Sequence, residues 1–222
     1  TDLNVSGNQL TALPDTLGAL TGLTELLAWG NKLTTLPDSI AALAQIKTLD
    51  LDSNKFTTLP RPVVKLTSLT ELGLSGNQLV TLPDWIAALT ALEKLDLSGN
   101  KLVTLPGSIA ALTALKELHL GSNKFTTLPK PIVKLTSLTE LSLSFNQLVT
   151  LPDSIAALTA LETLWLDSNQ IVTLPDSIAA LTALKTLDLF SNPLAKPQSS
   201  AVEAWLTALR AGSCTVRMSD GW

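Results

Sequence analysis

Residues 92–114 read LEKLDLSGNKLVTLPGSIAALTA, and this stretch is the pattern that decides the fold. The pattern recurs along the chain as L-x-x-L-x-L-x-x-N-x-L-x-x-L-P-x-x-I-x-x-L-T-x, with an asparagine every 23 residues. A fixed period of this length is typical of a solenoid, in which each repeat buries its apolar residues against its neighbours. The recurring residues are Asn8, Asn31, Asn54, Asn77, Asn100, Asn123, Asn146, Asn169 and Asn192.

One repeat combines a strand with a short helical turn. Leu95 and Leu97 alternate with Lys94 and Asp96, which is the two-residue period of a strand. Pro106 prevents the strand from continuing, because proline has no backbone N–H to donate. Apolar residues then recur at every third or fourth position, as in a helical turn. We therefore expect parallel strands on a concave face and helical turns on the convex side.

Two polar positions are predicted to support this architecture. The amide of each repeated Asn is expected to satisfy backbone groups in its own turn and in the next coil. Left unpaired, each such buried group would cost roughly 1–3 kcal/mol. An acidic residue follows Leu-Pro in several repeats and is expected to cap the free N–H groups of the helical turn. These residues are Asp38, Asp84, Asp153 and Asp176.

The repeat resembles a leucine-rich repeat of the 23-residue kind, as in intracellular Ras-group proteins. That kind has L-P-x-x-I/V-x-x-L on its return side, the segment that leads from one strand back to the next. The resemblance covers Thr1 to about Leu194 through nine Asn positions. It implies an α/β leucine-rich repeat solenoid, a right-handed horseshoe with a parallel concave sheet and short helical turns on the convex side. It also implies that the concave face binds macromolecules. The ending N-P-L…W-L…C is similar to the arrays attached to Roco-family GTPases, although no GTPase residues are present.

The chain is expected to divide into a repeat array at residues 1–194 and a C-terminal cap at residues 195–222. Within the cap, residues 199–211 are predicted to form an amphipathic helix, and residues 214–218 a last short strand. Such a cap covers the open apolar edge of the last coil. The apolar face of the predicted helix is formed by Val202, Trp205, Leu206 and Leu209.

Cysteine content and hydropathy bear on location. Cys214 is the only cysteine among 222 residues, so an intrachain disulfide is impossible and a cytoplasmic location is expected. No run of about 18 apolar residues occurs, so we predict no membrane insertion. Because Thr1 already lies inside a repeat, we expect the natural chain to continue upstream.

A longer duplication shows which positions have changed. Residues 54–122 and 123–191 align without gaps over 69 positions and differ at 15 of them. The outward positions of the concave face are predicted six, four, two and one residues before each Asn. Each block holds 12 such positions, and nine of the 15 differences lie there. Exposed return-side residues such as Thr81 and Thr150 are identical, which favours a recognition function for the concave face over drift.

The predicted concave face is acidic. It holds ten of the 19 acidic residues, and Lys94 is its one basic residue. Strands about 4.8 Å apart place these carboxylates in a dense strip. Such a strip attracts basic partners and repels nucleic acid. The alternative is that the charge serves solubility and prevents non-specific association. We expect the chain to be a monomer. The acidic residues are Asp2, Glu25, Asp50, Asp52, Glu71, Asp96, Glu117, Glu140, Asp167 and Asp188.

Aromatic residues of this face cluster near its C-terminal end. Three adjacent strands each carry one of them, namely Phe145, Trp165 and Phe190. The equivalent positions of residues 54–122, the sister block, hold Gly or Asp. Grouped exposed aromatics are typical anchors for a partner; the alternative is that they pack on one another. Trp29 lies about 29 Å away along the stack and is a second candidate contact. The predicted partner-binding residues are Trp29, Asp50, Asp52, Lys94, Asp96, Glu117, His119, Phe145, Trp165, Asp167, Asp188 and Phe190.

No pattern in the sequence indicates catalysis. His119 has no Ser or Cys nucleophile at a motif spacing and is interpreted as a surface residue. Asp50, Asp52 and Glu71 could share a cation, but an oxygen-only calcium site needs about six or more ligands. Neither a phosphate-binding loop nor a Cys/His metal cluster is present. We therefore expect no cofactor, no metal and no enzymatic activity.

These observations favour a non-enzymatic module that recognises a protein or peptide through its diversified acidic concave face. The partner is expected to be basic or to carry an apolar anchor. Near-identical repeats with one altered face suggest an immune or pathogen-recognition receptor. Two alternatives remain open: a regulatory or scaffold arm of a larger signalling protein such as a Roco-type GTPase, and an engineered repeat scaffold.

Overall fold

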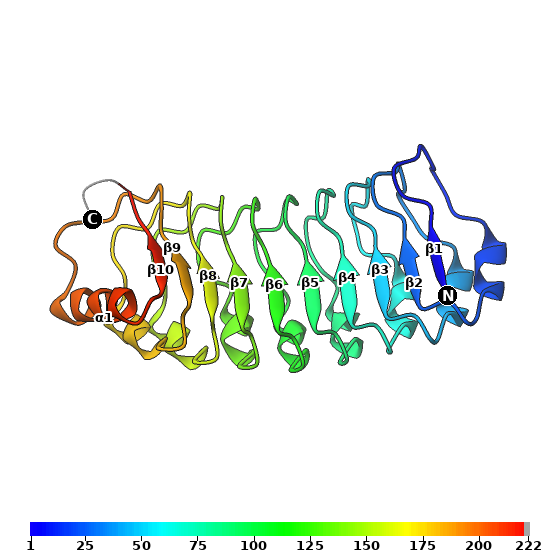
Figure 1. Ribbon diagram of the computed structural model, residues 1–222. Helices are drawn as coiled ribbons and strands as arrows, with labels where there is room; N and C mark the ends of the chain where they lie inside the picture. The colour runs from blue at the N-terminus through cyan, green and yellow to red at the C-terminus, as the bar shows by residue number, and fades with distance from the viewer. Residues whose placement is uncertain (220–222) are drawn as a thin grey trace.

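The computed structural model describes residues 1–219, and within them ten short strands lie side by side in one parallel sheet (Figure 1). The strands follow one another in chain order across the sheet. They are β1 (Asp2–Asn4), β2 (Glu25–Leu27), β3 (Thr48–Asp50), β4 (Glu71–Gly73), β5 (Lys94–Asp96), β6 (Glu117–His119), β7 (Glu140–Ser142), β8 (Thr163–Trp165), β9 (Thr186–Asp188) and β10 (Thr215–Arg217). Residues 220–222, the end of the predicted cap, lie outside the described residues.

Equivalent residues of successive repeats face one another across the sheet. Asp2 is paired with Glu25, and Leu95 with Leu118, in each case 23 residues apart. The middle residue of a strand points into the solenoid: Leu95 of β5 and Leu118 of β6 are fully buried. The residues on either side of Leu95 are partly exposed. This alternation confirms the predicted fold class, because a parallel leucine-lined sheet with one open face is what the repeat predicts.

The return segments form 3-10 helices. A proline precedes each of them, and its carbonyl accepts a hydrogen bond from the backbone N–H three residues later, as from Ile109 to Pro106 (3.2 Å). In residues 1–219 these helices are η1 (Asp15–Ala19), η2 (Asp38–Ala42), η3 (Arg61–Lys65), η4 (Asp84–Ala88), η5 (Gly107–Ala111), η6 (Lys130–Lys134), η7 (Asp153–Ala157) and η8 (Asp176–Ala180).

The predicted aspartate caps of these helices do not form. Proline occupies the cap position, and its side chain has no acceptor, while the Asp follows one residue too late to cap. Asp84 and Asp153 instead accept hydrogen bonds from the hydroxyls of Ser108 and Ser177 in the next coil, both at 3.1 Å. The aspartates therefore join neighbouring coils rather than stabilise a helix end.

The repeated asparagines form a buried ladder. The Asn100 Nδ2 donates to the carbonyls of Leu97 (3.0 Å) in its own turn and Leu74 (2.9 Å) in the preceding coil. Its Oδ1 accepts the N–H of Leu79, also in the preceding coil, at 2.9 Å. The predicted partner coil was therefore wrong: the amide reaches back, not forward. Asn8, which has no described coil before it, is exposed and bonds only within its own turn among the described residues.

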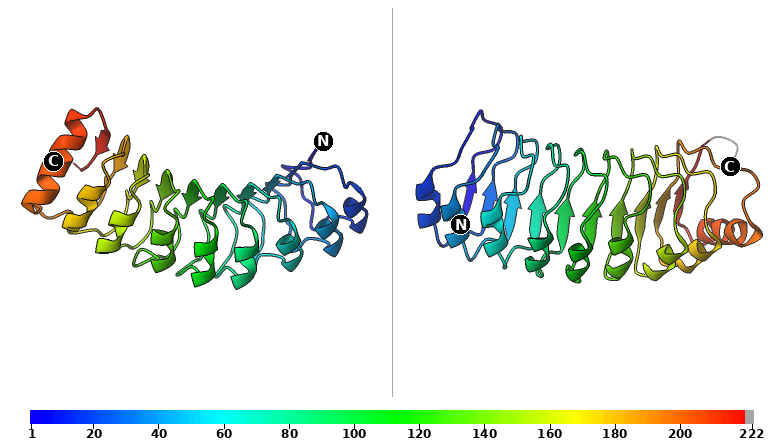
Figure 2. Two further views of the ribbon diagram at one scale, coloured as in Figure 1. Left: turned by 90° about the horizontal axis from the view of Figure 1, so that it is seen from below. Right: turned by 180° about the vertical axis from the view of Figure 1, so that it is seen from behind.

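The array bends into an arc with the sheet on its inner side. Seen from below, the strands line the concave side and the 3-10 helices the convex side (Figure 2, left). Strands lie about 4.8 Å apart, whereas the helical segments are wider, so stacking identical coils curves the solenoid toward the sheet. The outward strand residues consequently form one continuous concave face.

Helix α1 (Ser200–Ala211) and β10 cover the last repeat, where α1 lies against η8. The Ser199 side chain accepts a hydrogen bond from the Val202 N–H (3.2 Å), and Trp205 Nε1 donates to the Leu181 carbonyl (3.3 Å). No helix within residues 1–219 is long and apolar enough to cross a membrane. The buried residues of α1 are Val202, Trp205, Leu206 and Leu209, the four that the apolar pattern predicts.

Candidate recognition surface

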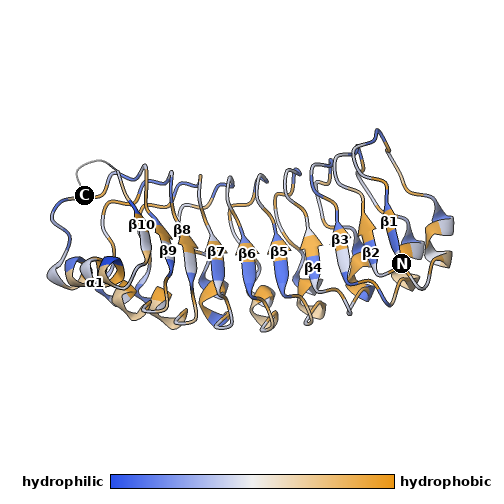
Figure 3. Ribbon diagram, in the orientation of Figure 1, coloured by the Kyte–Doolittle hydropathy of each residue, from blue (hydrophilic) through white to orange (hydrophobic). Residues whose placement is uncertain are grey.

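The concave face consists of the residues six, four, two and one positions before each repeated Asn. The ribbons of β5, β6 and β7 carry the blue of hydrophilic residues (Figure 3), and in each strand a partly exposed residue lies on either side of a buried central leucine. Lys94, Asp96, Glu117 and His119 are each partly exposed there. The alternation predicted from the sequence therefore places these candidate residues on one accessible surface.

An acidic hollow lies over β3, β4 and β5. Gly73 has no side chain, and this leaves a depression of about 130 Å³ between its neighbours. A Cβ at Gly73 would stand 2.8 Å from the Asp52 Oδ1, so a larger residue would displace Asp52. The hollow suits a basic side chain, because its charged lining residues are Asp50, Asp52, Glu71, Lys94 and Asp96.

Asp52 holds its proton more tightly than an ordinary aspartate. Burial, the largest cause, and repulsion from the Asp50 and Asp96 carboxylates raise the pKa of Asp52, a hydrogen bond from the Ser75 N–H lowers it, and the resulting pKa is about 6. That bond is 2.7 Å long. A cation in the hollow would stabilise the ionised form, so binding of a basic group is coupled to proton release below about pH 6.

A row of charged residues crosses the middle of the face. Glu71, Lys94, Glu117 and Glu140 stand in register on β4 to β7. Lys94 Nζ lies 2.9 Å from Glu117 Oε2, and this hydrogen bond raises the pKa of Lys94. Glu117 and Glu140 face one another as like charges, which is destabilising across a sheet. Lys94 compensates the charge of Glu117, and His119 lies beside Glu140.

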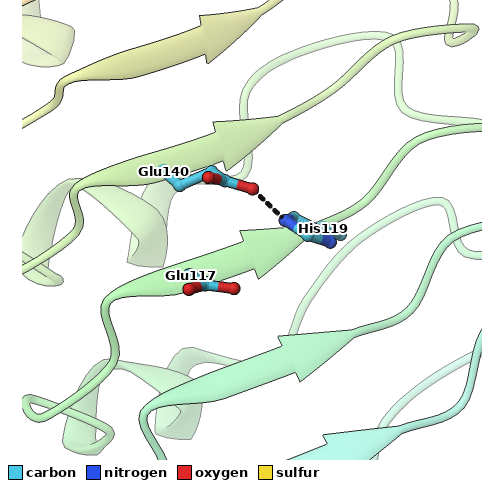
Figure 4. Close-up of side chains that lie close together, drawn as sticks. All are labelled: Glu117, His119 and Glu140. Carbon is cyan, nitrogen blue, oxygen red and sulfur yellow. Dashed lines mark hydrogen bonds and ion pairs between the residues drawn. The ribbon is translucent and has the colours of Figure 1, made fainter.

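His119 lies on the concave face, as predicted, and it has carboxylates on both sides, which the sequence did not predict. The residue is half-buried; its Nε2 lies 2.7 Å from Glu140 Oε1 (Figure 4), and its Nδ1 lies 3.7 Å from Asp96 Oδ2. Interaction with Asp96 raises the pKa of His119, burial opposes this to a smaller extent, and the Glu140 hydrogen bond raises it further. The sequence missed this arrangement because its members lie on three different strands.

The three aromatic residues near the C-terminal end differ in exposure. Phe145 and Phe190 are 61% and 44% exposed. Trp165 is partly buried, and its ring meets the His119 ring edge-on at 6.2 Å between centroids. Among the described residues, no ring contact joins the three aromatics to one another. Mutual packing therefore does not account for their presence.

Phe145 adopts a backbone conformation that disfavours its side chain. Its φ is +54°, in the left-handed region, at the position one residue before Asn146. Gly76, the equivalent residue of the sister block, has φ +65°. A residue with a Cβ costs about 1–2 kcal/mol in this region. The chain thus carries a strained and largely exposed phenylalanine where glycine fits without strain.

The acidic residues near the C-terminal end of the concave face are held by contacts within the chain that the sequence did not predict. Asp188 is only 4% exposed, because β10 lies beside it and Arg217 Nη1 approaches its Oδ2 to 2.7 Å. Arg217 also lies over the Phe190 ring, 5.6 Å from its centroid. Asp167 accepts a hydrogen bond from the Ser144 hydroxyl. The expectation that Asp188 is an open contact, with Lys94 as the one basic residue of the face, was therefore wrong.

Trp29 stands apart from the other candidates. It is 46% exposed and follows β2, near the N-terminal end of the array (Figure 1). β3 to β7 lie between β2 and β8 in the sheet, so Trp29 and Trp165 are not brought together. Asp50, Asp52, Lys94 and Asp96 lie between them, around the acidic hollow.

The repeat architecture matches a known family. The leucine-rich repeat model matches overlapping segments that together span most of the chain, and the protein therefore belongs to the leucine-rich repeat family. The matched model does not distinguish the Ras-group or Roco subtypes. A comparison with curated protein sequences gives no match. The matched residues are 21–79, 44–102, 80–125, 90–148 and 136–194.

Solved structures share the fold. A leucine-rich repeat protein of Leptospira interrogans is 39% identical, with a TM-score of 0.90, over 97% of this chain and 54% of its own. The ectodomain of the Arabidopsis thaliana membrane receptor kinase GASSHO1/SCHENGEN3, in complex with CASPARIAN STRIP INTEGRITY FACTOR 2, is 34% identical (TM-score 0.79; 98% of this chain, 26% of that chain). The Arabidopsis receptor kinase HAESA, with the peptide hormone IDA and the co-receptor SERK1, is 30% identical (TM-score 0.73; 86% and 34%). The present chain thus spans about half of the Leptospira protein and less of the plant proteins.

Proposed function

We propose that this leucine-rich repeat domain is a non-enzymatic recognition module that binds a protein or peptide along its concave face. Leucine-rich repeat domains serve protein interaction as a class, and two of the plant neighbours were solved with peptide or protein ligands. The partner is a segment with an apolar anchor and at least one basic side chain. The apolar anchor contacts Phe145, Trp165 and Phe190, and the basic side chain enters the acidic hollow.

The observation that carries this proposal is the strained exposure of Phe145. A side chain that is 61% exposed gains little from packing, and its positive φ costs about 1–2 kcal/mol. Neither folding nor solubility accounts for a phenylalanine there. Contact with a partner does, because exposed aromatics in a cluster form the anchors of many interfaces.

The acidic hollow supports the basic character of the partner. Four carboxylates and one lysine line the hollow, and burial and Asp50 raise the pKa of Asp52 to about 6, so that Asp52 takes up a proton below that pH. An entering Lys or Arg replaces the proton and pairs with the ionised carboxylate. The negative face also speeds the approach of a basic segment, and this effect weakens as salt is added.

The test is selection from a random peptide display library on the purified domain. Wild type is expected to select peptides that combine an aromatic or large aliphatic residue with Lys or Arg, and the triple variant Phe145→Ser, Trp165→Ser, Phe190→Ser is expected to lose them. A matched control changes Val80, Val103 and Val149 to Ser, because these valines are 50–58% exposed but lie off the concave face. Equal selection by all three proteins would contradict the proposal.

Two finer proposals concern the biological role of the domain and its location. A role in immune or pathogen recognition is supported by the concentration of block differences on the concave face. The cytoplasmic location predicted from the single Cys214 stays a prediction, since a plant neighbour is an ectodomain. A scaffold arm of a larger signalling protein is the outcome favoured if the triple variant and wild type select the same peptides.

A further inference from the structure

Three potential metal ligands converge on the middle of the concave face. Glu117 and His119 stand two residues apart on β6 and point to the same side, and Glu140 of β7 faces Glu117 in register (Figure 4). One ligand atom from each of the three lies within 4.8 Å of the others. We propose that Glu117, His119 and Glu140 form a binding site for a divalent transition-metal cation of the zinc type.

The ligand set matches zinc better than the common alkaline-earth ions. Zinc binds imidazole nitrogen and carboxylate oxygen at about 2.0–2.2 Å, which places ligands of a tetrahedral site about 3.3 Å apart. His119 Nε2 and Glu140 Oε1 are 2.7 Å apart, so this pair opens by a small rotation, while Glu117 closes in. Three protein ligands leave the fourth position to water. Calcium and magnesium require more ligands, all of them oxygen.

The surroundings orient these ligands as an outer shell does in zinc sites. Asp96 Oδ2 lies 3.7 Å from His119 Nδ1, on the side of the ring away from Glu140. A proton on Nδ1 directed at Asp96 leaves the Nε2 lone pair for the ion, as in carboxylate–histidine–zinc arrangements. Lys94 holds Glu117 through Oε2, which leaves Oε1 for coordination.

The local charge favours a bound cation. Glu117 and Glu140 are directly opposite one another, and Asp96 adds a third carboxylate beside the histidine. A metal binds Nε2 only when that nitrogen carries no proton, so protons compete with the metal for His119. The affinity is therefore expected to fall as the pH is lowered.

The same positions three repeats earlier offer a built-in comparison. Counting back 69 residues from the cluster gives Thr48, Asp50 and Glu71, where only the Glu140 equivalent is retained. Glu71 thus occupies the same position on β4 that Glu140 occupies on β7. Glu71→Gln is consequently a matched control: it removes one carboxylate from the same acidic face and leaves the proposed site intact.

The experiment is isothermal titration of the tag-free full chain with Zn²⁺ in a buffer that does not bind metals. Wild type is expected to show one dominant site, and His119→Gln and Glu140→Gln each to weaken it by more than about 100-fold. Asp96→Asn, which removes only an orienting group, is expected to weaken it by about 10-fold. Glu71→Gln should match wild type, and thermal unfolding without metal verifies that each variant is folded.

Three results would overturn the site. These are equal zinc affinity of wild type and His119→Gln, displacement of zinc by equimolar Mg²⁺, and loss of the signal in Cys214→Ser. The first two identify diffuse attraction by the acidic face, and the third identifies the cap cysteine as the ligand. Because zinc binding is measured on the chain without peptide, the outcome is independent of the peptide selection.

Discussion

Replacing Phe145 by glycine separates a binding role from a structural one. The change relieves about 1–2 kcal/mol of backbone strain at φ +54°. It also loses about 1 kcal/mol of packing, because burying a whole large apolar side chain is worth about 1.5–3 kcal/mol and Phe145 is 61% exposed. Glycine adds about 0.5–1 kcal/mol of chain entropy to the unfolded state. These contributions nearly cancel, so we expect the free energy of unfolding to change by less than about 1 kcal/mol.

The assay pairs chemical denaturation with affinity for a peptide selected by the wild type. Phe145→Gly should keep its denaturation midpoint and weaken peptide binding about 30-fold, which corresponds to the 2 kcal/mol of an interface hot spot. A loss of about 3 kcal/mol or more in unfolding free energy would instead identify a core residue and refute the reasoning.

The mirror substitution Gly76→Phe tests the strain itself. It places the same side chain at the equivalent left-handed position of the sister block, where a Cβ meets Ser53 Oγ at 3.1 Å. We expect a loss of about 1 kcal/mol in unfolding free energy. Unchanged or increased stability would show that the left-handed position does not penalise phenylalanine in this fold.

Three further predictions follow from the contacts. Asn100→Ala should lower the unfolding free energy by about 3 kcal/mol in a denaturation experiment, because buried N–H and carbonyl groups lose their partners. The control Asn8→Ala, at an exposed turn, should lower it by less than about 1 kcal/mol. The pKa of Asp52 is about 6 in the folded chain, above the ordinary aspartate value of 3.8, so the contribution of Asp52 to stability falls as the pH rises between these two values. Asp52→Asn should therefore raise the unfolding free energy by about 1 kcal/mol at neutral pH, after allowance for partial exposure, and change it little near pH 4. Thermal melts of both proteins at the two pH values test this. Arg217→Gln should lower the melting temperature and destabilise by about 1–2 kcal/mol, because the buried Asp188 carboxylate loses its partner; an unchanged melt would show that β10 does not depend on this pair.

Much of the site could be placed from the repeat alone, and the errors have identifiable causes. The two-residue strand period put Lys94, Asp96, Glu117 and His119 on one face, as the structure has them. Asp188 lies on the predicted face but is buried beside Arg217, a residue that the Thr-Val-Arg alternation at 215–217 places on the same side and that the predicted face left out. The aspartate caps failed because proline takes the cap position in every return segment described.

The sequence by itself determined the solenoid, its register and the residues of its core. Each of these follows from local periodicity, since a leucine every two or three residues and an Asn every 23 can be buried together only in stacked, aligned coils. The tertiary structure decided the chemistry of the concave face. The hollow at Gly73, the carboxylates around His119 and the pairing of Asp188 with Arg217 each join side chains of different coils. The distances within these groups, and the raised pKa values of Asp52 and His119, depend on neighbouring rotamers and burial, which a repeat pattern does not encode.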